Sequence, residues 1–289
     1  MWSNKHLTAA EALAAGRRLL PEDMAFDAEV LLRYVLQVDR TGLFREPERL
    51  LTCQEKEELS RLLQRRRAGE PVAYLTGSRE FMGLDFTVSP LVLIPRPETE
   101  LLVEHIIENL RPISGLTRII DVGTGSGAIA VSLAYTLTEA QLWAVDVSQA
   151  ALETARHNAT KHQVQSRINF VLSNLLAGVP PELLGIIDWI AANLPYIPDT
   201  DIPNLQRDVT AFEPHLALAG GPDGLDLYRQ LLPQAAQTLK PGGHIIMEMG
   251  HDQGPALASL LPEETWSDVH ILQDYAGLDR FVTARKRDF

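Results

Sequence analysis

The stretch that decides the fold is Ile119-Ile120-Asp121-Val122-Gly123-Thr124-Gly125-Ser126-Gly127. Its apolar start predicts a buried strand, and the three alternating glycines predict a tight turn into a helix that begins near Ala128. Such glycines let the backbone pass close to a ligand, and the helix start offers free N–H groups. The spacing differs from the dinucleotide fingerprint Gly-x-Gly-x-x-Gly, and Asp121 suits a cation better than a pyrophosphate. We therefore predict a nucleotide-type pocket at this turn.

Strands and helices alternate outward from this stretch to the end of the chain. We predict seven strands, the last two joined by Asp274–Asp279, which is too short for a parallel crossover, so the final strand should be antiparallel to its partner. The alternation favours an α/β fold with a mostly parallel, Rossmann-like sheet covered on both faces. The predicted strands are Thr117–Val122, Gln141–Val147, Ile168–Leu172, Ile186–Ala192, Gly243–Met249, Val269–Gln273 and Arg280–Ala284.

The chain before this region has a different pattern. Apolar residues recur at helical spacing from Leu7 to about Arg67, which predicts a small helical domain. Pro21 suits a helix start, and Thr52 stands three residues before Glu55, the capping-box spacing. Between residues 69 and 97 two β-rich runs, 80–88 and 91–94, flank Ser89-Pro90 and predict a hairpin linker.

Charge and composition narrow the class of protein. The 289 residues carry a formal net charge of −12, but residues 1–78 hold 12 basic and 12 acidic side chains, so the whole excess lies in 79–289. A polyanion should avoid that acidic region. The run 65–67 of arginines is either a docking face or a solvated helix end. One cysteine, Cys53, no export signal and no long apolar span favour a cytoplasmic protein.

Two further signals follow the glycine turn. Asp146 ends the next predicted strand, 19 residues after Gly127, where an acid can accept both ribose hydroxyls; the alternative is an ordinary helix cap. Asn193-Leu194-Pro195-Tyr196 then ends an apolar strand at the sheet edge where ligands bind. The asparagine oxygen and a nearby carbonyl can accept both hydrogens of a planar –NH2 group, with the tyrosine ring packed over it. The alternative for these four residues is a simple turn.

The glycine turn with its spaced acid resembles the class I S-adenosylmethionine-dependent methyltransferases. The Asn-x-Pro-Tyr sequence resembles the Asn-Pro-Pro-Tyr of members that methylate adenine, cytosine or glutamine. Leu194 replaces the first proline, and we expect it to loosen the turn. Asn174 stands where these enzymes usually place an aspartate for the adenine amine, and it can still accept through its amide oxygen. The resemblance implies a cofactor site made by Asp121, Gly123, Thr124, Gly125, Ser126, Gly127, Asp146, Val147, Asn174, Leu175 and Asn193.

Four further blocks, 66–74, 79–84, 93–103 and 212–225, resemble one branch, the protein-(glutamine-N5) methyltransferases of peptide-chain release factors, the HemK/PrmC family. This resemblance implies three regions: a helical substrate-recognition domain (1–78), a hairpin linker (79–97) and a methyltransferase domain (98–289). It also implies as substrate the glutamine of the Gly-Gly-Gln motif of class 1 release factors, with an effect on translation termination. The implied substrate-binding residues are Leu93, Pro95, Arg96, Pro97 and Glu98 together with Asn193, Leu194, Pro195 and Tyr196.

The hypothesis is direct methyl transfer from S-adenosylmethionine to the glutamine amide nitrogen, leaving S-adenosylhomocysteine, without a strong base. We expect a monomer with no metal, since the eight histidines lack ligand spacing, and with no direct nucleic-acid or membrane partner. The first alternative is a nucleic-acid adenine methyltransferase, against which stand the acidic catalytic region and the lack of a basic, aromatic recognition domain. The second is a binding module whose site has decayed at Leu194 and Asn174.

Overall fold

The computed structural model describes residues 6–110 and 115–288, and the chain forms two compact units. One unit comprises residues up to Ser78 together with Gln206–Phe212, and the other comprises Arg79–Leu205 and Glu213–Phe289. The separation near residue 78 follows the change of pattern in the sequence. The segment Gln206–Phe212 was expected in the α/β domain, but Phe212 and Arg207 lie against Gly69 of the helical unit. Within the described residues, no helix is long and apolar enough to cross a membrane.

The helical unit packs its helices around a leucine-rich core that includes Leu31, Leu32, Leu59 and Leu62. The predicted capping box is confirmed, because Thr52 and Glu55 bond reciprocally at the start of α4. Pro21 precedes only a short 3-10 turn, Glu22–Met24, before the next α-helix. The α-helices of this unit are α1 (Ala9–Leu19), α2 (Asp27–Leu36), α3 (Arg40–Arg45), α4 (Cys53–Arg67), α5 (Val72–Thr76) and α9 (Arg207–Phe212).

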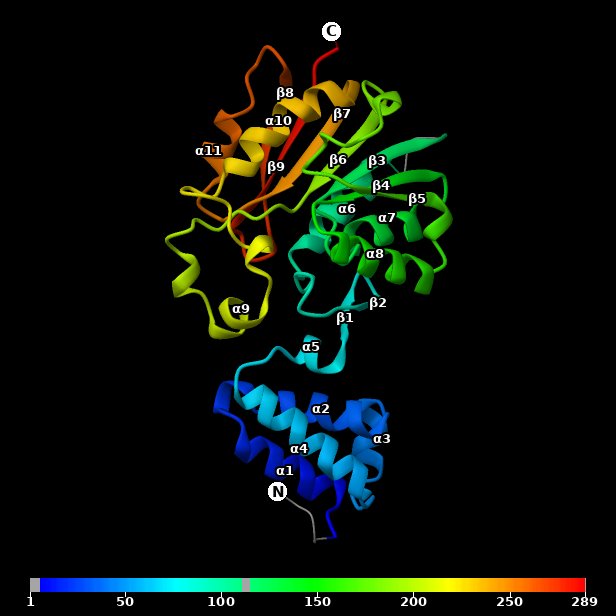
Figure 1. Cartoon of the computed structure of the whole chain (residues 1–289), viewed down its shortest axis with the longest axis vertical. Helices are drawn as coiled ribbons and strands as arrows, with labels where there is room; N and C mark the ends of the chain where they lie inside the picture. Colours follow the sequence, from blue (N-terminus) through cyan, green and yellow to red (C-terminus); the bar gives the residue numbers. More distant parts are fainter. Residues whose placement is uncertain (1–5, 111–114, 289) are drawn as a thin grey trace. The chain divides into compact units, whose positions relative to one another are not determined.

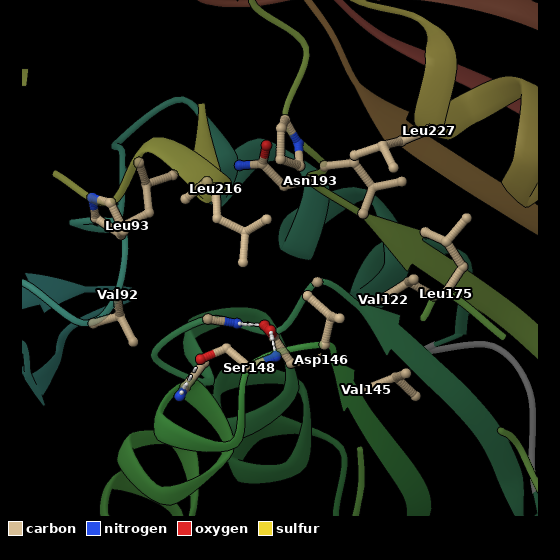
Figure 2. Close-up of a pocket in the computed structure, with 18 of the residues that line it drawn as sticks. Val92, Leu93, Val122, Val145, Asp146, Ser148, Leu175, Asn193, Leu216 and Leu227 are labelled. Carbon is tan, nitrogen blue, oxygen red and sulfur yellow. Dashed lines mark hydrogen bonds between the residues drawn. The ribbon is translucent and has the colours of Figure 1, made fainter. Parts of the chain in front are cut away.

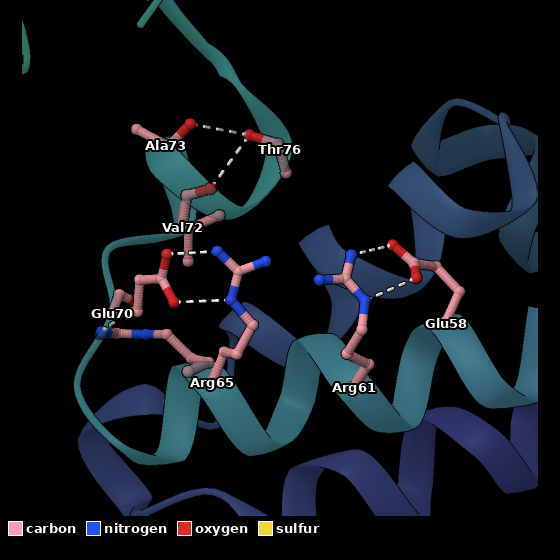
Figure 3. A network of polar contacts seen from close by, with 8 residues as sticks. Glu58, Arg61, Arg65, Glu70, Val72, Ala73 and Thr76 are labelled. Atoms are coloured by element: carbon pink, nitrogen blue, oxygen red, sulfur yellow. Dashed lines mark hydrogen bonds and ion pairs between the residues drawn. The ribbon is translucent and has the colours of Figure 1, made fainter. Parts of the chain in front are cut away.

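The arginine run at the end of α4 is largely engaged within its own unit. Arg65 donates to Glu70 (Nε–Oε2, 2.7 Å), as Figure 3 shows beside the pair Arg61–Glu58. Arg66 is only 8% exposed and donates to Asp27 (Nε–Oδ2, 2.7 Å). Two of the three guanidinium groups therefore hold α4 to its neighbours, which weakens the interpretation of the run as a docking face.

The hairpin linker differs from the prediction. A hairpin is present, but both of its strands, β1 (Ser78–Phe81) and β2 (Leu84–Thr87), precede Ser89-Pro90, and the second run, 91–94, is not a strand. Met82 and Gly83 form the turn with φ of +52° and +71°, the left-handed pair that a tight hairpin requires. The Met82 N–H donates to the Glu100 carboxylate (2.7 Å), so a distant residue helps to fix this turn.

The α/β unit is built on a seven-stranded sheet of order β5-β4-β3-β6-β7-β9-β8 (Figure 1). The pairs from β5 through β7 are parallel, and β9 is antiparallel to both β7 and β8, which confirms the predicted fold class and the antiparallel last strand. The strands are β3 (Thr117–Val122), β4 (Ala140–Asp146), β5 (Ile168–Leu172), β6 (Ile187–Ala192), β7 (Leu239–Glu248), β8 (Trp266–Gln273) and β9 (Asp279–Lys286).

Each face of the sheet has its own core because side chains alternate along a strand. Ile120 and Ile190 face a core shared with Tyr228, whereas Ile119 and Trp189 face the other core. Figure 1 shows the corresponding helices on the two sides of the sheet. One core takes α10 (Asp226–Thr238) and α11 (Gly254–Ser259), and the other takes α6 (Thr99–Leu110), α7 (Ala128–Thr136) and α8 (Gln149–Lys161).

The strand order places a switch point between β3 and β6. From β3 the chain winds through β4 to β5, and then crosses back to β6 on the other side of β3. Ligands of open α/β sheets bind outside the carboxyl ends of the strands at such a point. The glycine turn follows β3 and Asn193 follows β6, so the fold brings the two predicted motifs to one crevice.

Candidate active site

A cavity of about 390 Å³ opens at the carboxyl ends of β3, β4, β5 and β6. Figure 2 shows Asp146 below this opening and Asn193 above it in the view. Of the predicted site residues, those that line the cavity are Leu93, Gly123, Gly125, Asp146, Val147, Asn174, Leu175, Asn193, Leu194 and Pro195. A mostly apolar pocket of this size with a few polar groups fits a small organic ligand.

The glycine turn is held by backbone bonds to the neighbouring strand. The N–H groups of Gly123 and Thr124 both donate to the Val145 carbonyl, at 2.8 and 3.0 Å. The Gly125 N–H donates to Asp146 Oδ2 (2.9 Å). A Cβ at Gly125 would meet little but open space, whereas one at Gly127 would press on Ala155 of α8. Gly125 therefore leaves room for a ligand, and Gly127 serves the packing of α7 against α8.

Asp146 does not cap the following helix. Ser148 is the N-cap of α8, and its side chain accepts from Ala151. The Asp146 carboxylate instead accepts from Gly125 and from the Ser148 N–H (2.8 Å), and burial raises its pKa. Asp146 thus ties the glycine turn to the end of β4 while facing the cavity.

Asp121, the other acid of this motif, lies below the cavity. It is fully buried, and its Oδ2 accepts from the Thr124 hydroxyl (2.6 Å) and the Ala130 N–H (3.1 Å). Burial raises its pKa to about 7. Thr124 and Ser126 are buried as well. The structure therefore places these three residues behind the cavity lining, where they shape the turn.

Asn158 on α8 supports the same turn, and the sequence analysis missed it. Its Nδ2 donates to the Ser126 carbonyl (2.9 Å) and to the Thr87 carbonyl (2.9 Å), while its Oδ1 accepts from the Thr87 N–H (2.8 Å). This fully buried amide joins the end of the hairpin to the glycine turn. An asparagine inside an amphipathic helix was the only sequence signal for this role.

The turn after β6 is firmly held, contrary to the expectation that Leu194 loosens it. The Leu194 side chain is 4% exposed and lies against Gly123, and its N–H donates to the Tyr228 hydroxyl (3.4 Å). That hydroxyl donates in turn to the Glu248 carbonyl. A proline at 194 has no N–H for this bond. Leucine here therefore adds an anchor to the turn.

Tyr196 lies beside the cavity lining rather than in it. Its ring packs against the core that contains Tyr228, and its hydroxyl donates to Glu248 Oε1 (3.4 Å). Burial raises the pKa of this phenol, so it remains a donor at neutral pH. Its carbonyl accepts from Gln253 Nε2 (2.9 Å). A Cβ at Gly224 would lie 2.0 Å from the same carbonyl oxygen, so only glycine fits there.

The segment from Leu93 to Glu98 contributes only its first residue to the cavity lining. Pro95 is buried, while Pro97 and Glu98 are exposed and precede α6. Arg96 donates to the buried Glu213 (Nη2–Oε1, 2.6 Å). This ion pair connects the segment 93–98 to residues 214–217, which directly follow Glu213 in the sequence. Five further residues in or next to these two segments line the cavity and were not predicted from the sequence. They are Leu91, Val92, Pro214, Leu216 and Ala217.

Leu91 and Leu216 are 58% and 65% exposed, which gives the cavity an apolar rim. The block 212–225 contributes Pro214, Leu216 and Ala217 to the cavity lining, although the resemblance assigns no site residue to it. Among the described residues, no group of three or more His, Cys, Asp or Glu side chains could hold a metal ion. His244 on β7 stacks on Trp189 with 4.7 Å between ring centroids.

Comparison with solved structures agrees with this fold. A methyltransferase from Pyrococcus furiosus superposes with a TM-score of 0.52 at 17% identity, covering 82% of this chain and 100% of that one. The catalytic domain of hMettl16, in complex with an RNA hairpin, gives 0.56 at 16% identity, covering 84% and 85%. Residues 113–275 match the family described as a methyltransferase domain. The α/β unit is therefore a Rossmann-like methyltransferase domain.

The sequence relatives specify the branch. Residues 9–77 match the family described as the PrmC N-terminal domain. The release factor glutamine methyltransferase of Moorella thermoacetica is 44% identical over 282 residues, which are 97% of this chain and 96% of the relative. That of Bradyrhizobium diazoefficiens is 44% identical over 283 residues, 96% and 94% of the two chains. The chain belongs to the release factor glutamine methyltransferase family.

Proposed function

We propose that this protein transfers a methyl group from S-adenosylmethionine to the side-chain amide nitrogen of the glutamine in the Gly-Gly-Gln motif of a class 1 peptide-chain release factor. The observation that carries the proposal is the placement of Asn193 on the same cavity as the glycine turn and Asp146. The Asn193 side chain, which can accept a hydrogen bond from an –NH2 group, thus shares a cavity with the glycine turn and Asp146, which are expected to hold the methyl donor. The family membership and the names of the full-length relatives support the same substrate.

The residues present fit S-adenosylmethionine. Gly125 leaves backbone room at the cavity, and the Asp146 carboxylate, which accepts from the N–H groups of Gly125 and Ser148, would also accept from ribose hydroxyls. Val147 and Leu175 line the cavity and would supply apolar surface for an adenine ring, and the Asn174 amide oxygen would accept from its amine. When bound, this cofactor supplies a methyl group activated by a positively charged sulfur. The net acidic α/β region suits a cationic ligand.

The chain's own residues would position the amide nitrogen. It is a poor nucleophile because its lone pair is delocalised, so orientation and exclusion of water must supply much of the acceleration. Asn193 Oδ1 and the Leu194 carbonyl would accept the two amide hydrogens, and Tyr196 would pack nearby. The apolar rim of Leu91 and Leu216 would shield the reacting groups from water. The amide proton leaves late to water, because bonding to carbon makes the nitrogen more acidic.

We further propose that the helical unit recognises the release factor and that the enzyme acts as a monomer on protein, without nucleic acid. The balanced charge of residues 1–78 supports a protein partner in preference to a polyanion. Exchanging residues 1–78 and 206–212 together for those of a distant relative should raise the KM for the release factor and should leave methylation of a short Gly-Gly-Gln peptide less affected.

The test is a methylation assay followed by mass spectrometry of the product peptide. The substrates are a class 1 release factor, its Gly-Gly-Gln→Gly-Gly-Ala variant, and DNA. We expect one added methyl group on the glutamine and none on the other two substrates. Labelling of DNA alone would refute the proposal, and failure to bind S-adenosylmethionine in calorimetry would favour the decayed binding module.

The variant Asn193→Ala tests the amide acceptor directly. It should lower turnover by about a hundredfold or more, the usual cost of losing an acceptor or donor at the reacting group, while leaving cofactor affinity within about twofold. Asn109→Ala, on the exposed face of α6, is the matched control and should keep full turnover. Near-normal turnover of Asn193→Ala would exclude the assigned role.

A further inference from the structure

Behind the cavity, Asn193 ends a chain of buried hydrogen bonds that the mechanism above does not use. Its Nδ2 donates to Thr99 Oγ1 (3.1 Å), and the Thr99 hydroxyl donates to Glu248 Oε2 (2.6 Å). Thr99 is 4% exposed and Glu248 is 1% exposed. The three residues come from separate elements, since Asn193 follows β6, Thr99 begins α6 and Glu248 ends β7.

The donor and acceptor of each of these hydrogen bonds follow from the chemistry of Glu248. An ionised carboxylate can only accept hydrogen bonds, so the single hydroxyl proton of Thr99 must be donated to Glu248. The Thr99 oxygen is then left to accept, and only the –NH2 side of the Asn193 amide can donate to it. Consequently the amide oxygen of Asn193 points away from Thr99. An asparagine without this partner could present either end of its amide.

We propose that Thr99 and Glu248 are positioning residues that fix the orientation of the Asn193 amide, so that its oxygen and not its –NH2 group faces the substrate. This inference rests on the proposed function, because the oxygen is the end that must accept the hydrogens of a substrate amide. The carboxylate of Glu248 therefore acts on the Asn193 amide through two hydrogen bonds, and the Asn193 amide in turn contacts the reacting group. Neither residue touches substrate or cofactor itself.

The surroundings of Glu248 couple this orientation to pH. Its Oε1 accepts from the Tyr196 hydroxyl and its carbonyl accepts from Tyr228, while Arg280 lowers and Glu98 raises the pKa of its carboxyl group. Burial dominates and raises that pKa to about 7. Once protonated, the carboxyl group can donate to Thr99, and the constraint on the Asn193 amide is lost. Turnover should therefore fall with acidification below about pH 7.

The experiment compares Thr99→Val, Thr99→Ser and Glu248→Gln in the full-length enzyme with the release factor as substrate. Thr99→Val keeps the shape of threonine but removes its hydroxyl group, so kcat should fall about tenfold to a hundredfold, as expected for a misoriented catalytic group. Cofactor affinity should stay within about twofold. Thr99→Ser restores the hydroxyl group and should recover most of kcat.

Glu248→Gln removes the acceptor-only carboxylate, because glutamine can also donate to Thr99. We expect a lower kcat and the loss of the acid-side decline near pH 7. The matched control is Thr238→Val, since Thr238 is also buried, at 1% exposed, and donates to the Gln234 carbonyl (2.8 Å) on α10. This control should keep the wild-type kcat and pH profile.

Two results would overturn the inference: a kcat for Thr99→Val within about twofold of wild type, or an equal loss in Thr99→Val and Thr99→Ser. An unchanged acid-side decline in Glu248→Gln would exclude Glu248 as its source. These results are distinct from failure of the proposed function, which would appear as an absence of release-factor methylation by the wild-type enzyme. Thermal melts of each variant separate loss of orientation from loss of folding.

Discussion

The hydroxyl group of Tyr228 offers a sharp test of how the turn after β6 is anchored. This side chain is fully buried on α10, and its hydroxyl accepts from the Leu194 N–H and donates to the Glu248 carbonyl. Burial raises the pKa of this phenol well above its ordinary value, so the proton is retained for donation. Tyr228→Phe removes both bonds and leaves the packing of the ring intact.

The expected magnitude follows from the groups left without a partner. A buried backbone group that loses its hydrogen bond costs about 1–3 kcal/mol, and the ring's apolar burial is unchanged. We therefore expect the free energy of unfolding of the α/β unit to fall by about 1–3 kcal/mol. For a unit of this size, each kcal/mol lowers Tm by about 2–4 °C.

Differential scanning calorimetry and urea unfolding of the full-length protein measure this change. Tyr135→Phe is the matched control, because that side chain is 55% exposed and the same atom is removed. Its stability should stay within about 0.5 kcal/mol of wild type. If Tyr228→Phe unfolded at the same urea concentration as Tyr135→Phe, the hydroxyl group would not anchor the turn and the reasoning would fail.

Three other outcomes follow from the structure. Asp146→Ala should weaken S-adenosylmethionine binding by about tenfold or more in calorimetry, because the carboxylate of this residue orders the glycine turn through charge-assisted bonds; unchanged affinity would contradict this. Gly224→Ala should lose more stability than Gly277→Ala, although both have similar positive φ (+78° and +77°), because only the former meets a backbone oxygen; equal losses in urea unfolding would show that φ alone matters. Burial lowers the pKa of His244, so its contribution to stability is full above about pH 6.5 and declines as pH falls. The difference in unfolding free energy between wild type and His244→Gln should therefore shrink on acidification, and a constant difference from pH 8 to 5 would exclude this.

Much of the fold was predictable because the period of the apolar residues reports burial directly. The bounds of β3 and β5 match the prediction, since both strands end in clear polar or glycine signals. β7 begins four residues before the predicted Gly243, because pairing with β6 continues across a bulge in spite of Pro241-Gly242. The hairpin is present, but its turn was predicted at the wrong place because Ser-Pro is a stronger local turn signal than Met82-Gly83, whose turn is fixed from α6.

The candidate site was also predictable only in part. The glycine turn, Asp146 and Asn193 could be placed together from sequence, because the carboxyl ends of parallel strands share one edge of the sheet. The bond between Thr99 and Glu248 joins residues 149 positions apart, and no local pattern reports such a pairing. The apolar rim was also missed, because Leu91 and Leu216 lie in irregular segments without periodicity. Their roles in binding remain proposals.

The assignment of Gln206–Phe212 to the helical unit has a consequence for modularity. The chain passes from one unit to the other near residue 78, again after Leu205 and again before Glu213. An N-terminal domain that is joined to the next domain by a single linker can be exchanged or deleted as one continuous segment. The helical unit cannot, because it also includes residues 206–212, which lie within the sequence of the α/β unit. Deleting residues 1–78 would remove Gly69 and leave α9 without this contact. A chimera that exchanges the helical unit between relatives must therefore carry residues 206–212 from the same parent.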